Sequence, residues 1–186
     1  MNETLKAISE RYSCKNFSDT PVEADKLDAI ANAALASPSA TNKQPWQITV
    51  VTDKALITEL QDETVKVLST IPPMAGYYNM IVNTGMKLLG GASSMIVLPI
   101  DKANEFAQYD CGIAAQTICI AAQSLGVSSH IVAIPDMAFG GEKGSYFTEK
   151  FSFPEGYGFG LAVLLGYEAA PGKPHDTVPE KIVYIK

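Results

Sequence analysis

Residues 11–15 include three side chains that could bind a phosphate group. The segment reads Arg11-Tyr12-Ser13-Cys14-Lys15, and Arg11 is the only arginine in a chain of 186 residues. A guanidinium group offers a planar set of donors that matches phosphate oxygens, and a hydroxyl and an ammonium group add further donors. In an extended segment alternate residues share a face, so Arg11, Ser13 and Lys15 would point the same way. The segment is either a phosphate site or a solvated stretch of basic surface.

A second polar segment, SPSATNKQPW, follows at residues 37–46. Side-chain amides such as those of Asn42 and Gln44 have both donors and acceptors. The edge of a flavin ring presents alternating acceptor and N–H groups that these amides could match. Taken alone, the composition favours an ordinary polar loop that leads into a packed Trp46.

Other catalytic arrangements are missing from the sequence. Two histidines, His130 and His175, cannot supply a zinc cluster with ligand spacing. No phosphate-binding Gly-Lys-Ser/Thr loop or nucleophile elbow is present, and Cys14 has no histidine partner in sequence. His130 lies in an apolar stretch, where a hydrogen-bonded structural histidine is more common than an acid or base. We therefore expect no metal site and no catalytic side chain.

Hydropathy patterns outline the scaffold that must position these segments. Helical spacing of apolar residues predicts helices over residues 23–37 and, after an N-cap at Asp53, through about residue 69. An uncharged, small and apolar run predicts a buried or interface helix over residues 108–125. Strands are predicted at residues 47–53, 94–100, 127–134, 161–165 and 181–185. Irregular chain is expected at 71–91, with one helix, and at 136–160.

Composition limits the class of protein. The net charge of −6 and the pI near 4.9 argue against binding to nucleic acid or to an anionic membrane. The chain has 47% hydrophobic and 18% charged residues, which suggests surface buried against a second copy. No apolar run is long enough to span a membrane, no targeting segment is recognisable, and three cysteines form no C-x-x-C pair. We expect a soluble, cytoplasmic homodimer with one α+β domain over residues 1–186, built on a mixed β-sheet surrounded by helices.

The two polar segments together are recognisable. RYSCKNF, a helix preceded by Pro21 and including Leu27, and SPSATNKQPWQITVV closely resemble the opening of the nitroreductase family of FMN-dependent oxidoreductases. The resemblance is specific over residues 9–52 and continues more weakly through DCGIAAQTICIAAQSLG and LAVLLGYEA. It implies an α+β fold and an obligate homodimer with two FMN molecules at the interface, each bound by residues of both subunits.

The resemblance also implies roles for individual residues. Arg11, Ser13 and Lys15 would bind the ribityl phosphate and the ring edge, and Tyr12 would contribute backbone contacts. Residues that would contact FMN from the partner subunit are Pro38, Ser39, Ala40, Asn42 and Gln44. The stretch that would pass the flavin ring is Ser129, His130 and Ile131.

Two departures from the family pattern concern the phosphate. Glu10 stands where the family often has a second basic residue, and the tail has no arginine. Lys173, with His175 nearby, is the only basic candidate in the tail before Lys181, and His175 could equally be a solvated loop residue. Residues that could line a substrate pocket, with core packing as the alternative, are Tyr77, Tyr78 and Phe139.

The function implied by the resemblance is an FMN-dependent oxidoreductase. It would transfer hydride from NAD(P)H through flavin N5 to an electron-poor acceptor such as a nitroaromatic or quinone, with ping-pong kinetics. Positive charge from Arg11 and Lys15 would favour the anionic reduced flavin. Alternatives are a non-catalytic protein that stores, delivers or senses FMN, and a specialised family member that reduces enones, halogenated aromatics or free flavin. The sequence leaves open the acceptor and the choice between NADH and NADPH.

Overall fold

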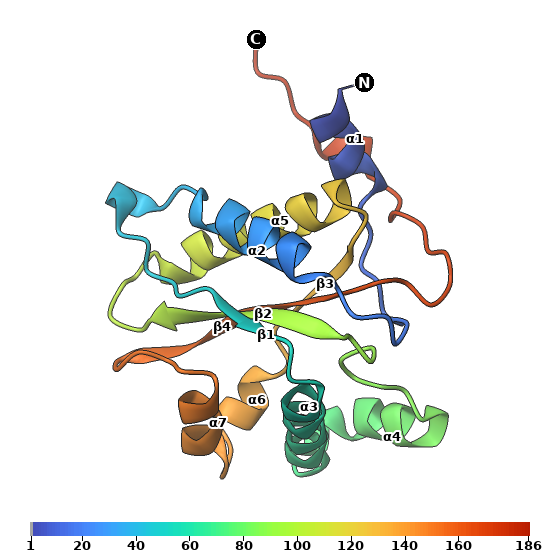
Figure 1. Ribbon diagram of the computed structural model, residues 1–186, viewed down its shortest axis with the longest axis vertical. Coiled ribbons are helices and arrows are strands. Elements are labelled where there is room, and N and C mark those ends of the chain that lie inside the picture. The colour runs from blue at the N-terminus through green and yellow to red at the C-terminus, as the bar shows by residue number, and fades with distance from the viewer. Residues whose placement is uncertain (1) are drawn as a thin grey trace.

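The computed structural model describes residues 2–186 and is built around a four-stranded sheet in the order β1-β2-β4-β3. All three strand pairs are antiparallel (Figure 1). The strands are β1 (Thr49–Val51), β2 (Ser94–Asp101), β3 (Ser128–Val132) and β4 (Tyr157–Gly166).

The prediction of a mixed sheet is therefore wrong. In the described part of the chain the parallel contact is an isolated bridge between Ser13 and Ser129, at the outer edge of β3. It does not extend into a strand, because two residues after Lys15 the chain turns to another partner and Phe17 N–H donates to the carbonyl of Gly90 at 2.9 Å.

Helices cover both faces of the sheet (Figure 1). On one face lie α2 (Ala24–Leu35) and α5 (Ala107–Ser124), and α1 (Glu3–Glu10) packs against α5. On the other face lie α3 (Lys54–Ser69), α4 (Ala75–Thr84), α6 (Asp136–Phe139) and α7 (Gly144–Lys150). Short 3-10 turns occur at Ala40–Asn42, Pro72–Met74 and Pro179–Lys181.

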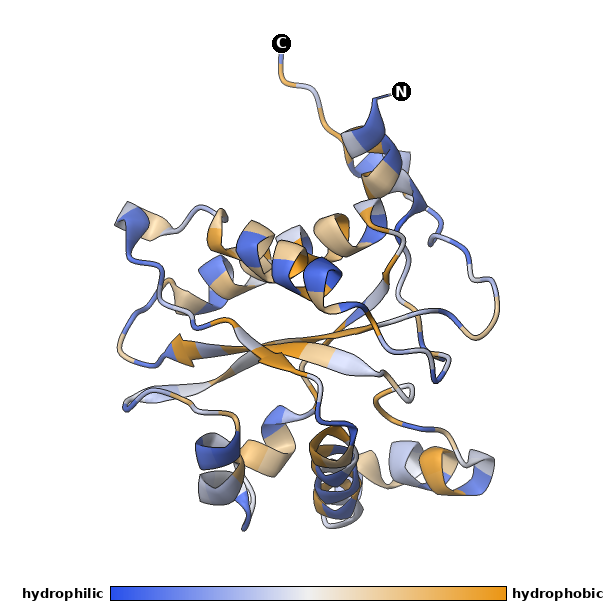
Figure 2. Ribbon diagram, in the orientation of Figure 1, coloured by the Kyte–Doolittle hydropathy of each residue, from blue (hydrophilic) through white to orange (hydrophobic). Residues whose placement is uncertain are grey.

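The two central strands are buried on both faces, which explains why they read as continuous apolar runs. Ile96 and Leu98 of β2 pack with α2 and α5, whereas Met95 and Val97 pack with the opposite helical layer. This is the two-residue alternation of a pleated strand. Figure 2 shows the hydrophobic sheet between helices that have mixed, amphipathic colouring. Each such side chain contributes about 1.5–3 kcal/mol on burial, so the middle of the sheet is the rigid part of the scaffold.

Most predicted elements are confirmed. The helices expected at 23–37 and 108–125 are α2 and α5, and the helix expected within 71–91 is α4. Asp53 caps α3, and its carboxylate accepts from the N–H groups of Ala55 and Leu56 at 2.9 and 3.1 Å. The strand expected at 47–53 is reduced to the three residues of β1.

The irregular loop predicted at 136–160 is wrong, because the segment forms α6, α7 and the start of β4. Aromatic packing explains the difference: the Phe139 ring stacks on Phe153 and Phe159, and Phe147 and Phe151 are fully buried. Burying these rings ties both short helices to the underside of the sheet.

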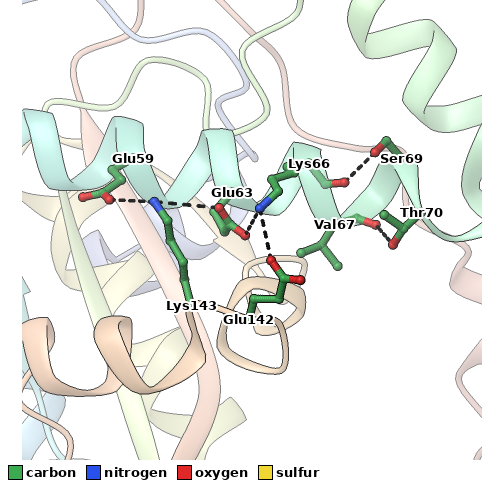
Figure 3. A network of polar contacts seen from close by, with 8 residues as sticks. All are labelled: Glu59, Glu63, Lys66, Val67, Ser69, Thr70, Glu142 and Lys143. Carbon is green, nitrogen blue, oxygen red and sulfur yellow. Dashed lines mark hydrogen bonds and ion pairs between the residues drawn. The ribbon is translucent and has the colours of Figure 1, made fainter.

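Ion pairs on the same side join this segment to α3 (Figure 3). Lys143 lies 3.1 Å from a Glu59 oxygen, and Lys66 lies 3.3 and 3.5 Å from oxygens of Glu63 and Glu142. The exposed pairs contribute only about 0–1 kcal/mol each, whereas the buried carboxylate of Glu63, with 5% exposure, is paired with both Lys66 and Lys143. The network therefore joins α3 to the segment that begins α7.

The strand predicted at 181–185 is also wrong. Ile182, Val183, Tyr184 and Ile185 have exposed fractions of 62, 79, 79 and 97%. A β-strand needs a neighbouring strand for its hydrogen bonds, and no backbone bond joins these four residues to any strand of their own chain within residues 2–186. The apolar pattern of this C-terminal arm is real, but the chain itself offers it no partner. Among the described residues, no helix combines the length and the hydropathy required of a membrane span.

Gly160 in β4 gives a test of the packed sheet. A Cβ added there would lie 2.7 Å from the Leu98 carbonyl oxygen and 2.8 Å from Cys111 Sγ. Gly160→Ala should therefore lower the free energy of unfolding by about 2 kcal/mol, the usual cost of overpacking. The control is Gly76→Ala in α4, where a Cβ meets nothing within 4 Å. Thermal unfolding should show a lower Tm for the first variant alone; equal Tm values would contradict the packing at β4.

Candidate functional site

The segment 11–15 lies along the edge of β3. Arg11 ends α1 with extended backbone angles of φ −61° and ψ 133°, and Cys14 N–H donates to the Ser129 carbonyl at 3.0 Å. Cys14 points into the core with 2% exposure, whereas Ser13 and Lys15 are exposed. This alternation confirms the predicted shared face for Ser13 and Lys15.

A cavity of about 640 Å³ lies over this exposed face. It brings together three parts of the chain that are far apart in the sequence: the extended segment 11–15, strand β3 and the C-terminal tail. We call it the basic cavity. Its lining residues are Tyr12, Ser13, Lys15, His130, Lys173, Pro174, His175 and Asp176. Six of these eight are residues that the sequence predicted for a cofactor site.

Tyr12 and Gly172 explain how the tail reaches the cavity. Tyr12 OH donates a hydrogen bond to the Glu168 carboxylate, and Gly172 lies directly against the Tyr12 ring. A Cβ at position 172 would lie 2.1 Å from Tyr12 Cε2, so only glycine permits this approach without a shift of the ring. The predicted role of Tyr12 was backbone contact; in addition, its side chain positions the stretch that includes Lys173.

The electrostatic environment of the basic cavity is positive. The half-buried His130 has a lowered pKa, mainly because burial disfavours its charged form and also because Lys15 and Arg11 repel a proton there. Within residues 2–186, Arg11, Lys15 and Lys173 form no ion pair with a carboxylate, although Asp176 lines the same cavity. Unpaired cations around one cavity suit an anionic ligand.

Of the three residues predicted to pass the flavin ring, His130 alone lines the basic cavity. Ser129 is 2% exposed beside Cys119, and Ile131 packs against the core under α2 and α5. Strand alternation accounts for this, because residues 129 and 131 face the opposite side from 130. Side-chain contact with a ligand is therefore expected of His130 alone.

The polar segment 38–44 lies elsewhere. Ala40 N–H donates to both Asp110 oxygens at 3.2 Å, in the first turn of α5. Arg11 lies near the other end of α5, because its charge acts to lower the pKa of the Cys119 thiol. Cys119 is about 14 Å from Asp110 along the helix axis. In Figure 1 the turn that includes Ala40 and the end of α1 lie toward opposite ends of α5. One chain therefore does not bring Pro38, Ser39, Ala40, Asn42 and Gln44 to the basic cavity.

The three residues predicted for a substrate pocket pack against apolar neighbours. Tyr77 and Tyr78 of α4 lie half-buried against a cluster that includes Leu68, Ile81 and Leu88. Phe139 belongs to the aromatic cluster beneath the sheet. None of them lines the basic cavity, and their role toward a substrate stays a prediction.

No cysteine in the chain is placed to act as a nucleophile. Cys14, Cys111 and Cys119 are all buried, and burial raises the pKa of each thiol, to about 12 for Cys111. A thiol is a nucleophile only as the thiolate. Among residues 2–186, no three His, Cys, Asp or Glu side chains cluster in a way that could bind a metal ion.

Sequence reasoning missed four residues that shape the site: Asp110, Glu168, Gly172 and Asp176. Asp110 had a visible signal, because it is the only charged residue of an 18-residue helix. Glu168 and Gly172 had none, since their importance depends on where the tail meets Tyr12.

Comparisons with known proteins identify the family. The nitroreductase family profile matches residues 8–167. A solved nitroreductase with bound FMN from Desulfitobacterium hafniense DCB-2 is 41% identical, with full coverage of both chains and a TM-score of 0.95. An FMN-dependent nitroreductase from Clostridium difficile R20291 is 25% identical over 99% of both chains, with a TM-score of 0.84. The FMN reductase [NAD(P)H] of Bacillus subtilis is 29% identical over 143 residues, which are 69% of this chain and 53% of the relative. By fold and by sequence, the chain belongs to the nitroreductase family.

Proposed function

We propose that the basic cavity binds the phosphate end of FMN and that the protein is an NAD(P)H-dependent flavin oxidoreductase. The observation that supports this most is the group of cations around one cavity that lack carboxylate partners in residues 2–186. A phosphate monoester has a charge of about −1.5 to −2 at neutral pH, which matches this unpaired charge. The names of the relatives from Desulfitobacterium hafniense and Bacillus subtilis point the same way.

The residues present fit the proposed cofactor. Ser13 offers a hydroxyl, and Lys15 and Lys173 offer ammonium groups on the cavity wall; Arg11 does not line the cavity, but its charge acts on His130. When bound, FMN would supply the two-electron chemistry, taking hydride from NAD(P)H and passing it to an electron-poor acceptor such as a nitroaromatic or quinone.

The chain's own residues then bind and orient rather than react. Burial, together with Lys15 and Arg11, lowers the pKa of His130, which favours the neutral imidazole as a hydrogen-bonding group. Arg11 and Lys15 would offset negative charge that develops nearby. No cysteine lines the basic cavity, and the proposal needs no electron carrier other than the flavin.

A homodimer would complete this site. Apolar side chains lie exposed along neighbouring helices α1 and α5, with a groove of about 470 Å³ between them. We define the α1–α5 face by its exposed apolar residues, which are Leu5 and Ile8 on α1 and, toward the other end of α5 (Figure 1), Phe106, Tyr109 and Ile113. Covering it with a second copy would remove exposed apolar surface and would let the partner supply its segment 38–44. The exposed C-terminal arm is a further apolar surface that a second copy could cover.

Reduction by nicotinamide is the test of enzymatic function. Protein saturated with FMN should lose its visible flavin absorbance when NADH or NADPH is added without oxygen, and recover it with a quinone. Steady-state double-reciprocal plots should be parallel, since one pocket serves donor and acceptor in turn. His130→Gln should keep most of its reductive rate. A flavin that neither nucleotide bleaches would instead indicate storage, delivery or sensing of FMN.

Lys15→Ala tests the cavity as the phosphate site, because Lys15 lines it. Loss of one charge-assisted contact, worth about 1.5–3 kcal/mol, predicts about a ten- to hundredfold rise in the Kd for FMN. Titration of the ligand-free protein, followed by flavin fluorescence, measures this. Lys102→Ala removes a cation that does not line the cavity and serves as the control. An unchanged Kd in Lys15→Ala would show that FMN phosphate lies elsewhere.

The dimer is tested at Ile113, which is 41% exposed on the α1–α5 face. Ile113→Glu would place a charge in the proposed interface, where burial without a partner costs several kcal/mol. Sedimentation at micromolar concentration should find a dimer in the wild type and mostly monomer in the variant. Thr58→Glu, on the exposed side of α3, should stay dimeric. A wild-type monomer that binds FMN tightly would contradict the proposal.

A further inference from the structure

The segment 39–44 has a strained backbone without any glycine. Thr41, Asn42 and Gln44 have φ values of 50°, 56° and 47°. Non-glycine residues adopt the left-handed region infrequently, and three of them within four positions persist only where surrounding contacts over-determine the shape.

Most contacts of this segment are internal. Gln44 N–H donates to Ser39 Oγ at 2.9 Å, and Gln44 Nε2 donates to Asn42 Oδ1 at 2.9 Å. These bonds would move with the segment and cannot fix it to the rest of the protein. The flanks are anchored separately: Ser37 Oγ lies 2.9 Å from Thr117 Oγ1, and the Pro45 carbonyl accepts from Asp101 N–H at 2.9 Å.

Asp110 supplies the anchor between these flanks. Both of its oxygens lie 3.2 Å from Ala40 N, and its side chain is 4% exposed. In the part of the chain that the structure describes, no other hydrogen bond joins residues 39–44 to a different element. The contact is charge-assisted, which makes it one of the stronger kinds of hydrogen bond.

The environment of Asp110 indicates that the carboxylate serves this contact. It has no cation partner within residues 2–186, and α5 begins after Phe106 without a side-chain cap hydrogen bond, so the carboxylate does not cap its own helix. A buried charge is costly unless hydrogen bonds and a favourable dipole compensate it. The first turn of α5 offers the dipole, and Ala40 offers the hydrogen bond.

We propose that Asp110 is a positioning residue for the cofactor: it fixes segment 39–44 in the strained shape in which that segment contacts FMN bound in the partner subunit. This inference rests on the proposed FMN function and on the proposed dimer. It assigns a role to the single charged side chain of α5, which does not itself touch the cofactor.

The test compares Asp110→Ala, Asp110→Asn and a control, Ser37→Ala, which removes a buried hydrogen bond to the same helix from the flank. Asp110→Ala should raise the Kd for FMN by about tenfold or more, as expected for losing one charge-assisted hydrogen bond. Asp110→Asn keeps an acceptor for Ala40 N–H and should recover most of the affinity. Ser37→Ala should keep the wild-type Kd.

A second readout needs no cofactor. Lys43 is exposed within the segment, and trypsin should cleave after it faster in FMN-free Asp110→Ala than in wild type or Ser37→Ala. Wild type that binds no FMN would refute the proposed function itself. Wild type that binds FMN, alongside Asp110→Ala with unchanged Kd and unchanged cleavage at Lys43, would overturn this inference alone. A lowered Tm with both readouts unchanged would assign Asp110 a purely structural role, which also overturns it.

Discussion

The hydrogen bond from Cys14 N–H to the Ser129 carbonyl sets the position of the basic cavity. It fixes residues 13–15 against the edge of a sheet whose central strands are buried on both faces, so Ser13 and Lys15 inherit the rigidity of that sheet. Strand β3, which includes Ser129, also orients His130 toward the basic cavity. A basic cavity made from two short segments would be mobile in solution. Attached to β3, the wall formed by Ser13, Lys15 and His130 is in place before any ligand arrives, which reduces the entropy that binding must overcome.

The sequence was most informative where local pattern and tertiary surroundings agree. An extended 11–15 segment was predicted to place Arg11, Ser13 and Lys15 on one face; this is confirmed for Ser13 and Lys15, which line the basic cavity, whereas Arg11 is half-buried and does not line it. Asp53 capped its helix as expected, and the apolar run of β2 lies where the pattern placed it. Lys173 and His175, the predicted basic candidates in the tail, both line the basic cavity.

Failures of prediction have a common physical origin in partners that are distant along the chain. The segment 136–160 looked irregular because no local periodicity records that Phe139 will stack on Phe153 and Phe159. The apolar arm at 181–185 read as a strand because its composition suits one, but strand formation depends on a neighbour. Gly172 could not be identified as a requirement, since the need for glycine arises only when Tyr12 lies against it. The sheet was expected to be mixed because strand direction is not encoded in hydropathy.

The tail that crosses Tyr12 joins two surfaces of different character. Lys173 and His175 line the basic cavity, and residues 176–181, which include the short turn at Pro179–Lys181, separate His175 from the exposed apolar residues that begin at Ile182. Any ligand that orders residues 173–176 therefore restricts the start of the arm, and any surface that captures the arm restricts the wall of the cavity. By thermodynamic linkage the two effects must be equal in free energy. Occupancy of the cavity and burial of the arm are thus expected to be reciprocal, so that apparent ligand affinity would depend on protein concentration wherever the arm is covered by another molecule.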